Sequence, residues 1–110
     1  MPSQFYIKKD DTRPAITANL TDANDATVNL TGASVKFNMR VDPAGAIKIN
    51  LGTAVIENAE AGQVSYSWSS DNTDTADDYE AEFQVTFAGG AVQTFPGRNW
   101  ILVHVIDDIA

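Results

Sequence analysis

The chain has 110 residues, of which 44% are hydrophobic and 20% are charged, and it contains no cysteine. This length suits one domain, residues 1–110, with one hydrophobic core, and the composition argues against wholesale disorder. The lack of cysteine excludes disulfides, thiolate nucleophiles, thiolate metal sites and redox motifs, so packing has to stabilise the fold.

The formal net charge of −8 is concentrated in the second half of the chain. Residues 1–50 carry six basic and five acidic side chains, whereas residues 51–110 carry one and ten. Nucleic acids and anionic membranes are bound through clustered lysine and arginine, so neither is an expected partner. No apolar run approaches the ~20 residues of a membrane-spanning helix, and the N-terminus lacks a signal-peptide layout. We expect a soluble protein made in the cytoplasm and not exported.

Taken in chain order, short runs of alternating apolar and polar side chains predict about eight strands. Successive side chains of a strand point to opposite faces, so this alternation indicates strands with one dry and one wet face. Proline, glycine, asparagine and aspartate separate the runs, and no segment shows helical spacing. The expected strands cover residues 4–8, 15–21, 34–41, 46–50, 53–58, 63–69, 79–87 and 99–106. The pattern predicts an all-β, immunoglobulin-like antiparallel β-sandwich of about seven to nine short strands.

The run 79–87 is the most regular of these strands. Glu80 and Glu82 occupy its wet parity, and Gly89-Gly90 after it can form a tight hairpin to residues 92–96. Tyr79 stands two residues before a core position, as the tyrosine of a "tyrosine corner" does in immunoglobulin-like sandwiches.

Residues 34–41 and 79–87 are predicted to be antiparallel neighbours. This pairing would set two basic side chains opposite two acidic ones across an exposed surface, where each pair contributes about 0.2–1 kcal/mol. The four residues are Lys36, Arg40, Glu80 and Glu82.

The last run, residues 99–106, is apolar on both parities. It is either central and covered on both faces or in contact with another subunit, and an edge that accepts a partner strand would explain the pattern. Together with the segment 5–14, its outer parity forms the candidate contact surface. The candidate partner-binding residues are Phe5, Tyr6, Arg13, Trp100, Leu102, His104 and Ile106.

Catalytic chemistry finds little support in the sequence. His104 is the sole histidine and lies within an apolar strand, and no Gly-x-Ser-x-Gly motif is present. Glu80 and Glu82 share a strand face, which is more typical of a solvated stripe than of a glycosidase pair. We expect no enzymatic activity and no cofactor.

Two other kinds of site were weighed. The loop 71–78 offers hard oxygen ligands that suit calcium, but it lacks the spacing of an EF-hand, so an acidic turn with local side-chain-to-backbone bonds is favoured and no metal is expected. Four aromatic side chains could stack on sugars: Tyr6, Tyr66, Trp68 and Trp100. Tyr66 and Trp68 share the strand parity of Val64, which favours a place in the core for these two.

Four segments carry a resemblance to a known family: residues 5–16, 30–40, 78–87 and 94–96. The most specific motifs are Lys-Lys-x-Asp-Thr at 8–12, Leu-Thr-Gly-Ala at 30–33 and Asp-Tyr-x-Ala-Glu-Phe at 78–83. In these segments the chain resembles the immunoglobulin-like domain at the N-terminus of the baseplate upper protein of phages of Gram-positive bacteria. The same domain is found in small stand-alone virion proteins. The chain departs from the family at Asp78, where glycine is frequent.

The resemblance implies a structural component of a tailed-phage virion, in the tail or baseplate, that acts as a protein–protein docking module. Its partners would be other virion proteins of the tail, baseplate or capsid within a symmetric assembly, and it would supply no catalytic residue. Two alternatives remain open at this point: a capsid decoration or neck protein of the same fold, and a host-surface carbohydrate-binding module.

Overall fold

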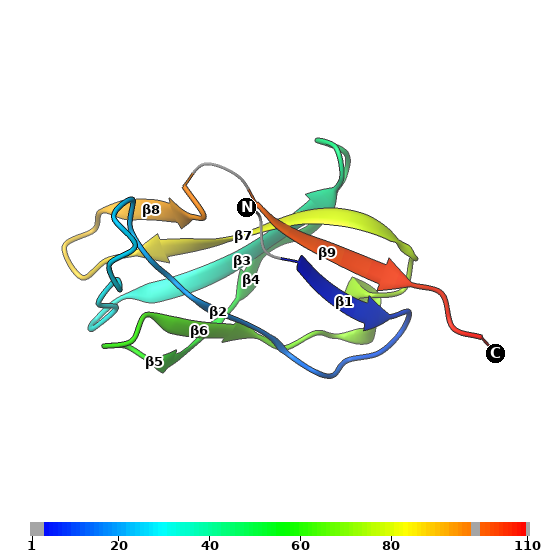
Figure 1. Ribbon diagram of the computed structural model, residues 1–110, viewed down its shortest axis with the longest axis horizontal. Helices are drawn as coiled ribbons and strands as arrows, with labels where there is room; N and C mark the ends of the chain where they lie inside the picture. The colour runs from blue at the N-terminus through cyan, green and yellow to red at the C-terminus, as the bar shows by residue number, and fades with distance from the viewer. Residues whose placement is uncertain (1–3, 98–99, 110) are drawn as a thin grey trace.

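The computed structural model describes residues 4–97 and 100–109. Within these residues the chain forms nine β-strands and one short 3₁₀ helix, arranged as two packed sheets (Figure 1). The prediction of an all-β sandwich is confirmed. The elements are β1 (Gln4–Lys8), β2 (Ile16–Asn19), β3 (Ser34–Val41), β4 (Ile47–Thr53), β5 (Val55–Asn58), β6 (Gln63–Tyr66), η1 (Ser70–Asn72), β7 (Asp77–Thr86), β8 (Val92–Phe95) and β9 (Ile101–Ile106).

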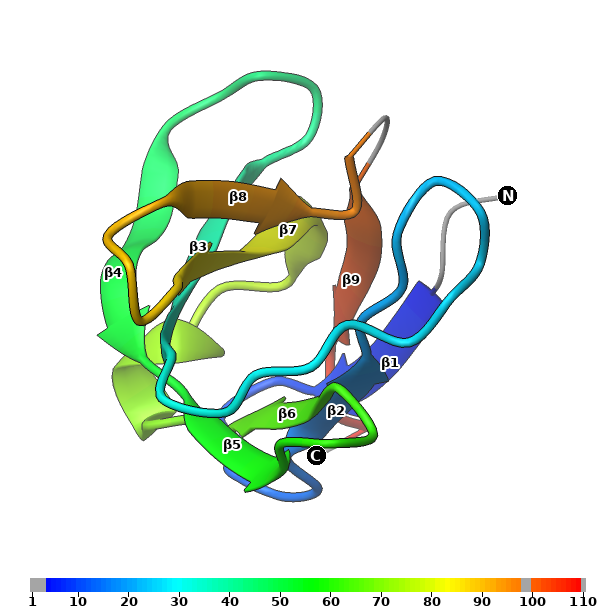
Figure 2. The same ribbon diagram turned by 90° about the vertical axis from the view of Figure 1, so that its left-hand side faces the viewer.

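The larger sheet has six strands in the order β1-β9-β7-β3-β4, and β8 also pairs with β7. The smaller sheet has the order β2-β6-β5. Figure 2 shows the larger sheet curving around the smaller one, with its edge strands β4 and β1 on either side. The predicted antiparallel arrangement is wrong at one place, because β1 runs parallel to β9, with Tyr6 beside His104. Strands so far apart in the sequence can pair in either direction, and strand alternation does not specify which.

The predicted antiparallel pairing of β3 with β7 is confirmed over its whole length, from Ser34 opposite Thr86 to Val41 opposite Tyr79. A fixed register sends the same parity of both strands into the core. Phe37 and Phe83 therefore meet on the inner face, while Arg40 lies opposite Glu80 on the outer face.

The core lies between the two sheets and is centred on Phe37. Its ring stacks on Tyr66 at 4.6 Å, lies 5.0 Å from Phe83 and meets the edge of Trp68 at 5.7 Å. Trp68 also donates a hydrogen bond from Nε1 to the Pro14 carbonyl at 3.1 Å. Offset and edge-to-face aromatic contacts of this kind add to the energy of burial. The predicted inward orientation of Tyr66 and Trp68 is confirmed.

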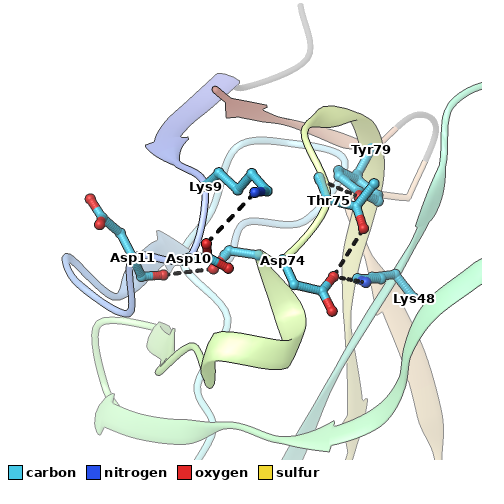
Figure 3. A network of polar contacts seen from close by, with 8 residues as sticks. Lys9, Asp10, Asp11, Lys48, Asp74, Thr75 and Tyr79 are labelled. Atoms are coloured by element: carbon cyan, nitrogen blue, oxygen red, sulfur yellow. Dashed lines mark hydrogen bonds and ion pairs between the residues drawn. The ribbon is translucent and has the colours of Figure 1, made fainter. Parts of the chain in front are cut away.

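The tyrosine corner is present. Tyr79 is 1% exposed, and its hydroxyl donates a hydrogen bond to the Thr75 carbonyl at 2.8 Å (Figure 3). The same loop holds the N-terminal segment, because the buried Thr73 hydroxyl donates to the Asp11 carbonyl at 2.8 Å and the Asp10 amide donates to the Thr73 carbonyl. The loop 70–76, which begins with η1, is thus hydrogen-bonded both to the chain after β1 and to Tyr79 of β7.

Several strand boundaries differ from the prediction. The run 63–69 ends as a strand at Tyr66, because the Asn72 side chain accepts hydrogen bonds from the Ser69 amide and the Tyr66 hydroxyl and turns the chain into η1. The run 15–21 is reduced to four paired residues, and the last strand begins at Ile101. The predicted start of that strand, Asn99, lies outside the described residues. The part of the chain that the structure describes holds no helix with the length and apolar character of a membrane span.

Candidate functional site

Most of the predicted contact residues lie on the outer face of the six-stranded sheet, the face turned away from β2, β6 and β5. Ile101, Val103 and Val105 enter the core, so the alternate residues of β9 point outward. These outward residues are Leu102, His104 and Ile106. β9 is central in its sheet, between β1 and β7, but its outward parity is only partly covered, since Leu102 and His104 are half-buried and Ile106 is exposed.

His104 joins three strands on this face. Its ring stacks on Tyr6 of β1 at 4.7 Å. Its Nδ1 lies 2.7 Å from an Asp78 carboxylate oxygen of β7, and its Nε2 lies 2.9 Å from the Gln4 side-chain oxygen of β1. This arrangement fixes the outer side of the β1–β9–β7 register and leaves Tyr6 59% exposed.

Three predictions for this surface need correction or refinement. β9 has a strand on each side and cannot accept a partner strand, so the predicted open edge is wrong. Phe5 points inward and packs on Trp68 at 5.7 Å, since it shares the core parity of Ile7. Arg13 is exposed and lines a shallow hollow of about 230 Å³ with Tyr6.

A larger groove, of about 600 Å³, crosses the outer face over β4, β3 and β7. Asn38, Arg40, Glu80, Glu82 and Gln84 line its floor, and Ile47, Leu51 and Trp100 are the large exposed apolar side chains along it. Of the predicted contact residues, Trp100 alone borders this groove.

The groove is shaped by irregular pairing of β4 with β3. Phe37 pairs with Gly52 and Met39 with Ile49, so β4 has two residues, one of them Leu51, where β3 has one. A second register shift follows toward Ile47, and such bulges bend the strand that contains them. Leu51 adopts a φ of 54°, and its amide donates to the Asn38 side-chain oxygen at 2.7 Å.

Gly52 completes this bend. A Cβ at this position would lie 2.8 Å from Tyr66 Cε1 and 2.9 Å from Ile49 Cγ2, so only glycine lets β4 approach the core there. The two register shifts and the close approach together hollow the outer face beside β3.

Glu80 is the one buried carboxylate of the described residues, with 5% of its side chain exposed. Arg40 Nε donates to it at 2.6 Å, and the Ala44 amide donates to the same oxygen at 3.2 Å. Burial raises the pKa of Glu80, but the hydrogen bonds from Arg40 and Ala44 outweigh this effect and hold the pKa below its ordinary value. Burial and a hydrogen bond with Glu80 raise the pKa of the neighbouring Asp42.

The predicted exposed charge pairs are therefore half right. Arg40 does pair with Glu80, but the pair is partly buried, because the guanidinium lies over the Trp100 ring at 5.1 Å and the loop 42–45 folds back onto the carboxylate. Lys36 lies opposite Gln84, and its Nζ contacts the Thr53 hydroxyl at 3.5 Å.

Glu82 is half-buried in the groove. The Asn38 side-chain amide donates to it at 3.5 Å, a long contact, and within residues 4–97 and 100–109 no cation forms an ion pair with it. The sequence pattern assigned Glu82 to a solvated stripe. Nothing in the alternation of β7 signals a groove above it, because the bulges of β4 create the groove.

The acidic segment 71–78 includes the first two residues of β7, and its side chains have separate partners. Asp74 pairs with Lys48 at 2.5 Å and accepts from the Thr75 hydroxyl (Figure 3), and these hydrogen bonds lower its pKa. Asp77 accepts from the Asp78 amide, a local bond of the predicted kind. Among the described residues, no three histidine or acidic side chains are grouped as a metal site would require.

The four aromatic residues considered for sugar stacking do not form a platform. Tyr66 and Trp68 are 8% and 5% exposed and belong to the core. Tyr6 stacks on His104, whereas Trp100 contacts Arg40 beside the groove. The parity shared with Val64 was the signal that assigned Tyr66 and Trp68 correctly.

No protein-family model matches the chain, and a search of curated proteins finds no match. Function is therefore inferred from the surface geometry and from the segments that carry the family resemblance.

Proposed function

We propose that this protein is a structural component of a tailed-phage virion, in the tail or baseplate, and that it docks onto other virion proteins through the outer face of its six-stranded sheet. The docking face consists of Tyr6, Trp100, Leu102, His104 and Ile106. Neither a catalytic group nor a cofactor takes part.

The observation that carries this proposal is the apolar surface on the outer face of β1 and β9. A strand with one solvated face normally places polar side chains on that face. Here Tyr6, Ile106 and Trp100 are 59%, 41% and 38% exposed, and the half-buried Leu102 and His104 lie on the same face. Large exposed apolar side chains gathered on one face mark an interaction site.

The segments that resemble the phage domain support the proposal in a second way, because they build the frame that presents this face. Asp10 and Asp11 are hydrogen-bonded to Thr73, Leu30 is fully buried before β3, and Tyr79 forms the tyrosine corner. A rigid module held by such contacts loses little conformational entropy when it docks.

The proposal is tested by locating the protein in purified particles of the phage that encodes it. Mass spectrometry of the particles should detect the chain, and antibody labelling in electron micrographs should place it at the tail. Label on the head or neck would assign it instead to capsid decoration or the neck. Absence from the particles would overturn the proposal.

The docking face is tested by Ile106→Asp, with Val55→Asp as the matched control. Val55 lies on β5 of the smaller sheet and is 52% exposed, compared with 41% for Ile106. We expect both variants to fold and only Ile106→Asp to be lost from the particles. Normal incorporation of Ile106→Asp would show that the docking face lies elsewhere.

A further inference from the structure

We propose that the groove over β4, β3 and β7 receives a lysine or arginine side chain of the partner protein, presented on an extended segment between aliphatic side chains. This inference rests on the proposed docking function and names the chemistry of its partner. The groove is the surface lined by Asn38, Arg40, Ile47, Leu51, Glu80, Glu82, Gln84 and Trp100.

The floor of the groove favours a cation. Glu80 and Glu82 line it, and Arg40 is the single basic side chain that lines it among the residues that the structure describes. Arg40 is already engaged, because its guanidinium donates to Glu80 at 2.6 Å and lies over the Trp100 ring. Within residues 4–97 and 100–109, Glu82 has the 3.5 Å contact from Asn38 and no ion pair. A protein that covers the groove would strip water from this carboxylate, which is costly unless the partner brings an opposite charge.

The walls of the groove suit aliphatic side chains. Ile47 is 68% exposed and Leu51 is 50% exposed, and both belong to β4, which forms one edge of the sheet. Trp100 stands at the β9 side of the groove. An extended segment that places a basic side chain over Glu82 would set its neighbouring side chains against these apolar groups, so that both parts of the surface are covered together.

Leu51 is held in this position at a conformational cost. Its φ of 54° lies in the left-handed region, which glycine and asparagine adopt more readily than leucine. The bulge that requires this conformation also turns the leucine side chain into solvent. A strained and exposed leucine beside a charged floor is consistent with a binding role.

A sugar fits this groove less well. Sugars stack on open aromatic faces, and Trp100, the sole aromatic side chain lining the groove, has the Arg40 guanidinium over its ring at 5.1 Å. Two of the other exposed lining side chains, Ile47 and Leu51, are aliphatic and offer no hydrogen bond to a hydroxyl group.

The test uses the whole protein and three short peptides with blocked ends: Ser-Val-Arg-Val-Ser, the same peptide with lysine at the centre, and the same peptide with neutral citrulline at the centre. Amide and indole signals of the ¹⁵N-labelled protein are followed during titration. We expect the arginine and lysine peptides to shift the signals of Leu51 and Trp100. The citrulline peptide should bind about tenfold more weakly, because it lacks the charge-assisted bond to Glu82.

Glu82→Gln is the variant that tests the floor, and Glu60→Gln is its control. Glu60 is an exposed residue of the turn before β6, away from the groove, so the two variants make the same chemical change. We expect the NMR spectrum of Glu82→Gln to remain that of a folded protein and its affinity for the arginine peptide to fall about tenfold. The affinity of Glu60→Gln for this peptide should not change.

Three results would overturn the inference: no shift with either basic peptide up to about 10 mM, equal binding of the citrulline peptide, or equal binding by Glu82→Gln. Chitotetraose serves as the sugar probe, and its binding to the groove of both Glu82→Gln and the unmodified protein would point to a glycan site instead. None of these results depends on whether the protein is found in phage particles. The groove inference can therefore fail while the proposed docking function holds.

Discussion

The two faces of the six-stranded sheet are built by the same strands, but they have different roles. On the inner face, Phe37, Phe83 and Val103 are completely buried and pack in an apolar core. On the outer face, the alternate residues of the same strands form a few polar contacts, such as those of Arg40 and His104. Apolar side chains such as Ile106 are left exposed there. Because the side-chain period of a strand is two, each face can be changed without moving the other. The comparison teaches that apolar burial is concentrated on one parity, and that the other parity carries the surface proposed above for docking.

The largest effect is expected for Phe37→Ala on the inner face. Phe37 contacts three other aromatic rings and is 0% exposed. Its truncation should lower the free energy of unfolding by about 3–5 kcal/mol through lost burial and a residual cavity. Urea unfolding measures the change. Phe37→Leu, which fills part of the space, should cost clearly less, and a loss below about 1 kcal/mol for the alanine variant would mean that the core collapses around the site.

Arg40→Met tests the outer-face ion pair whose carboxylate, Glu80, is buried. It leaves the Glu80 carboxylate without its cation, and we expect a loss of about 2 kcal/mol. This value is below the full cost of an unpaired buried charge, because the Arg40 side chain is 40% exposed. The double variant Arg40→Met/Glu80→Gln should recover part of the loss. If it is no more stable than Arg40→Met, the arginine stabilises through its contact with Trp100.

The same pair makes stability depend on pH. The pKa of Glu80 is lowered from its ordinary value of 4.5 in the folded state, so the unfolded chain binds the proton more readily. The stabilisation is therefore complete above pH 4.5 and is lost as the pH falls through the lowered value. Urea unfolding from pH 7 down to pH 3 should show a smaller decrease for Glu80→Gln than for the unmodified protein. Parallel curves would contradict this origin of the acid sensitivity.

The inner face could largely be predicted from the sequence. Alternation in residues 34–41 and 79–87 gave the correct parity and the correct pairing, and the position of Tyr79 gave the tyrosine corner. The tyrosine corner is encoded by residues close together in the sequence. The pairing is encoded by two long runs whose apolar side chains have to lie on the same face of the sheet.

The outer face could not be predicted in the same way. The parallel pairing that sets Tyr6 beside His104 joins residues nearly the whole chain apart, and no local pattern specifies its direction. The groove depends on the register shifts of β4, which the sequence shows only as two interrupted short runs. Glu80 occupies a wet parity and is nevertheless buried, because the loop 42–45 folds back onto it and Arg40, which pairs with it, is held against Trp100.

Tyr79→Phe should have an intermediate effect of about 1 kcal/mol, the value of one hydrogen bond with little change in packing. The tyrosine hydroxyl donates to the Thr75 carbonyl at 2.8 Å and holds the loop 70–76. Amide exchange should quicken for Thr73 and Asp74 in this loop. Tyr66→Phe is the comparison, since it removes a buried hydroxyl that donates to Asn72 at the end of η1 and leaves the bond to Thr75 in place. Exchange at Thr73 and Asp74 that is no faster in Tyr79→Phe than in the unmodified protein would mean that the corner does not hold the loop.

Leu51→Gly should have the smallest effect on folding and should change it in the opposite direction. Glycine relieves the left-handed backbone at φ 54°, while the side chain that is lost is half exposed and contributes little burial. We expect thermal unfolding to show stability unchanged or raised by up to about 1 kcal/mol. Binding of the arginine peptide should weaken in the same variant, because one aliphatic wall of the groove is removed. Leu51→Ala separates the two effects, since it removes the wall and keeps the backbone cost. A clear loss of stability in the glycine variant would show that Leu51 belongs to the folding face of the sheet and not to its binding face.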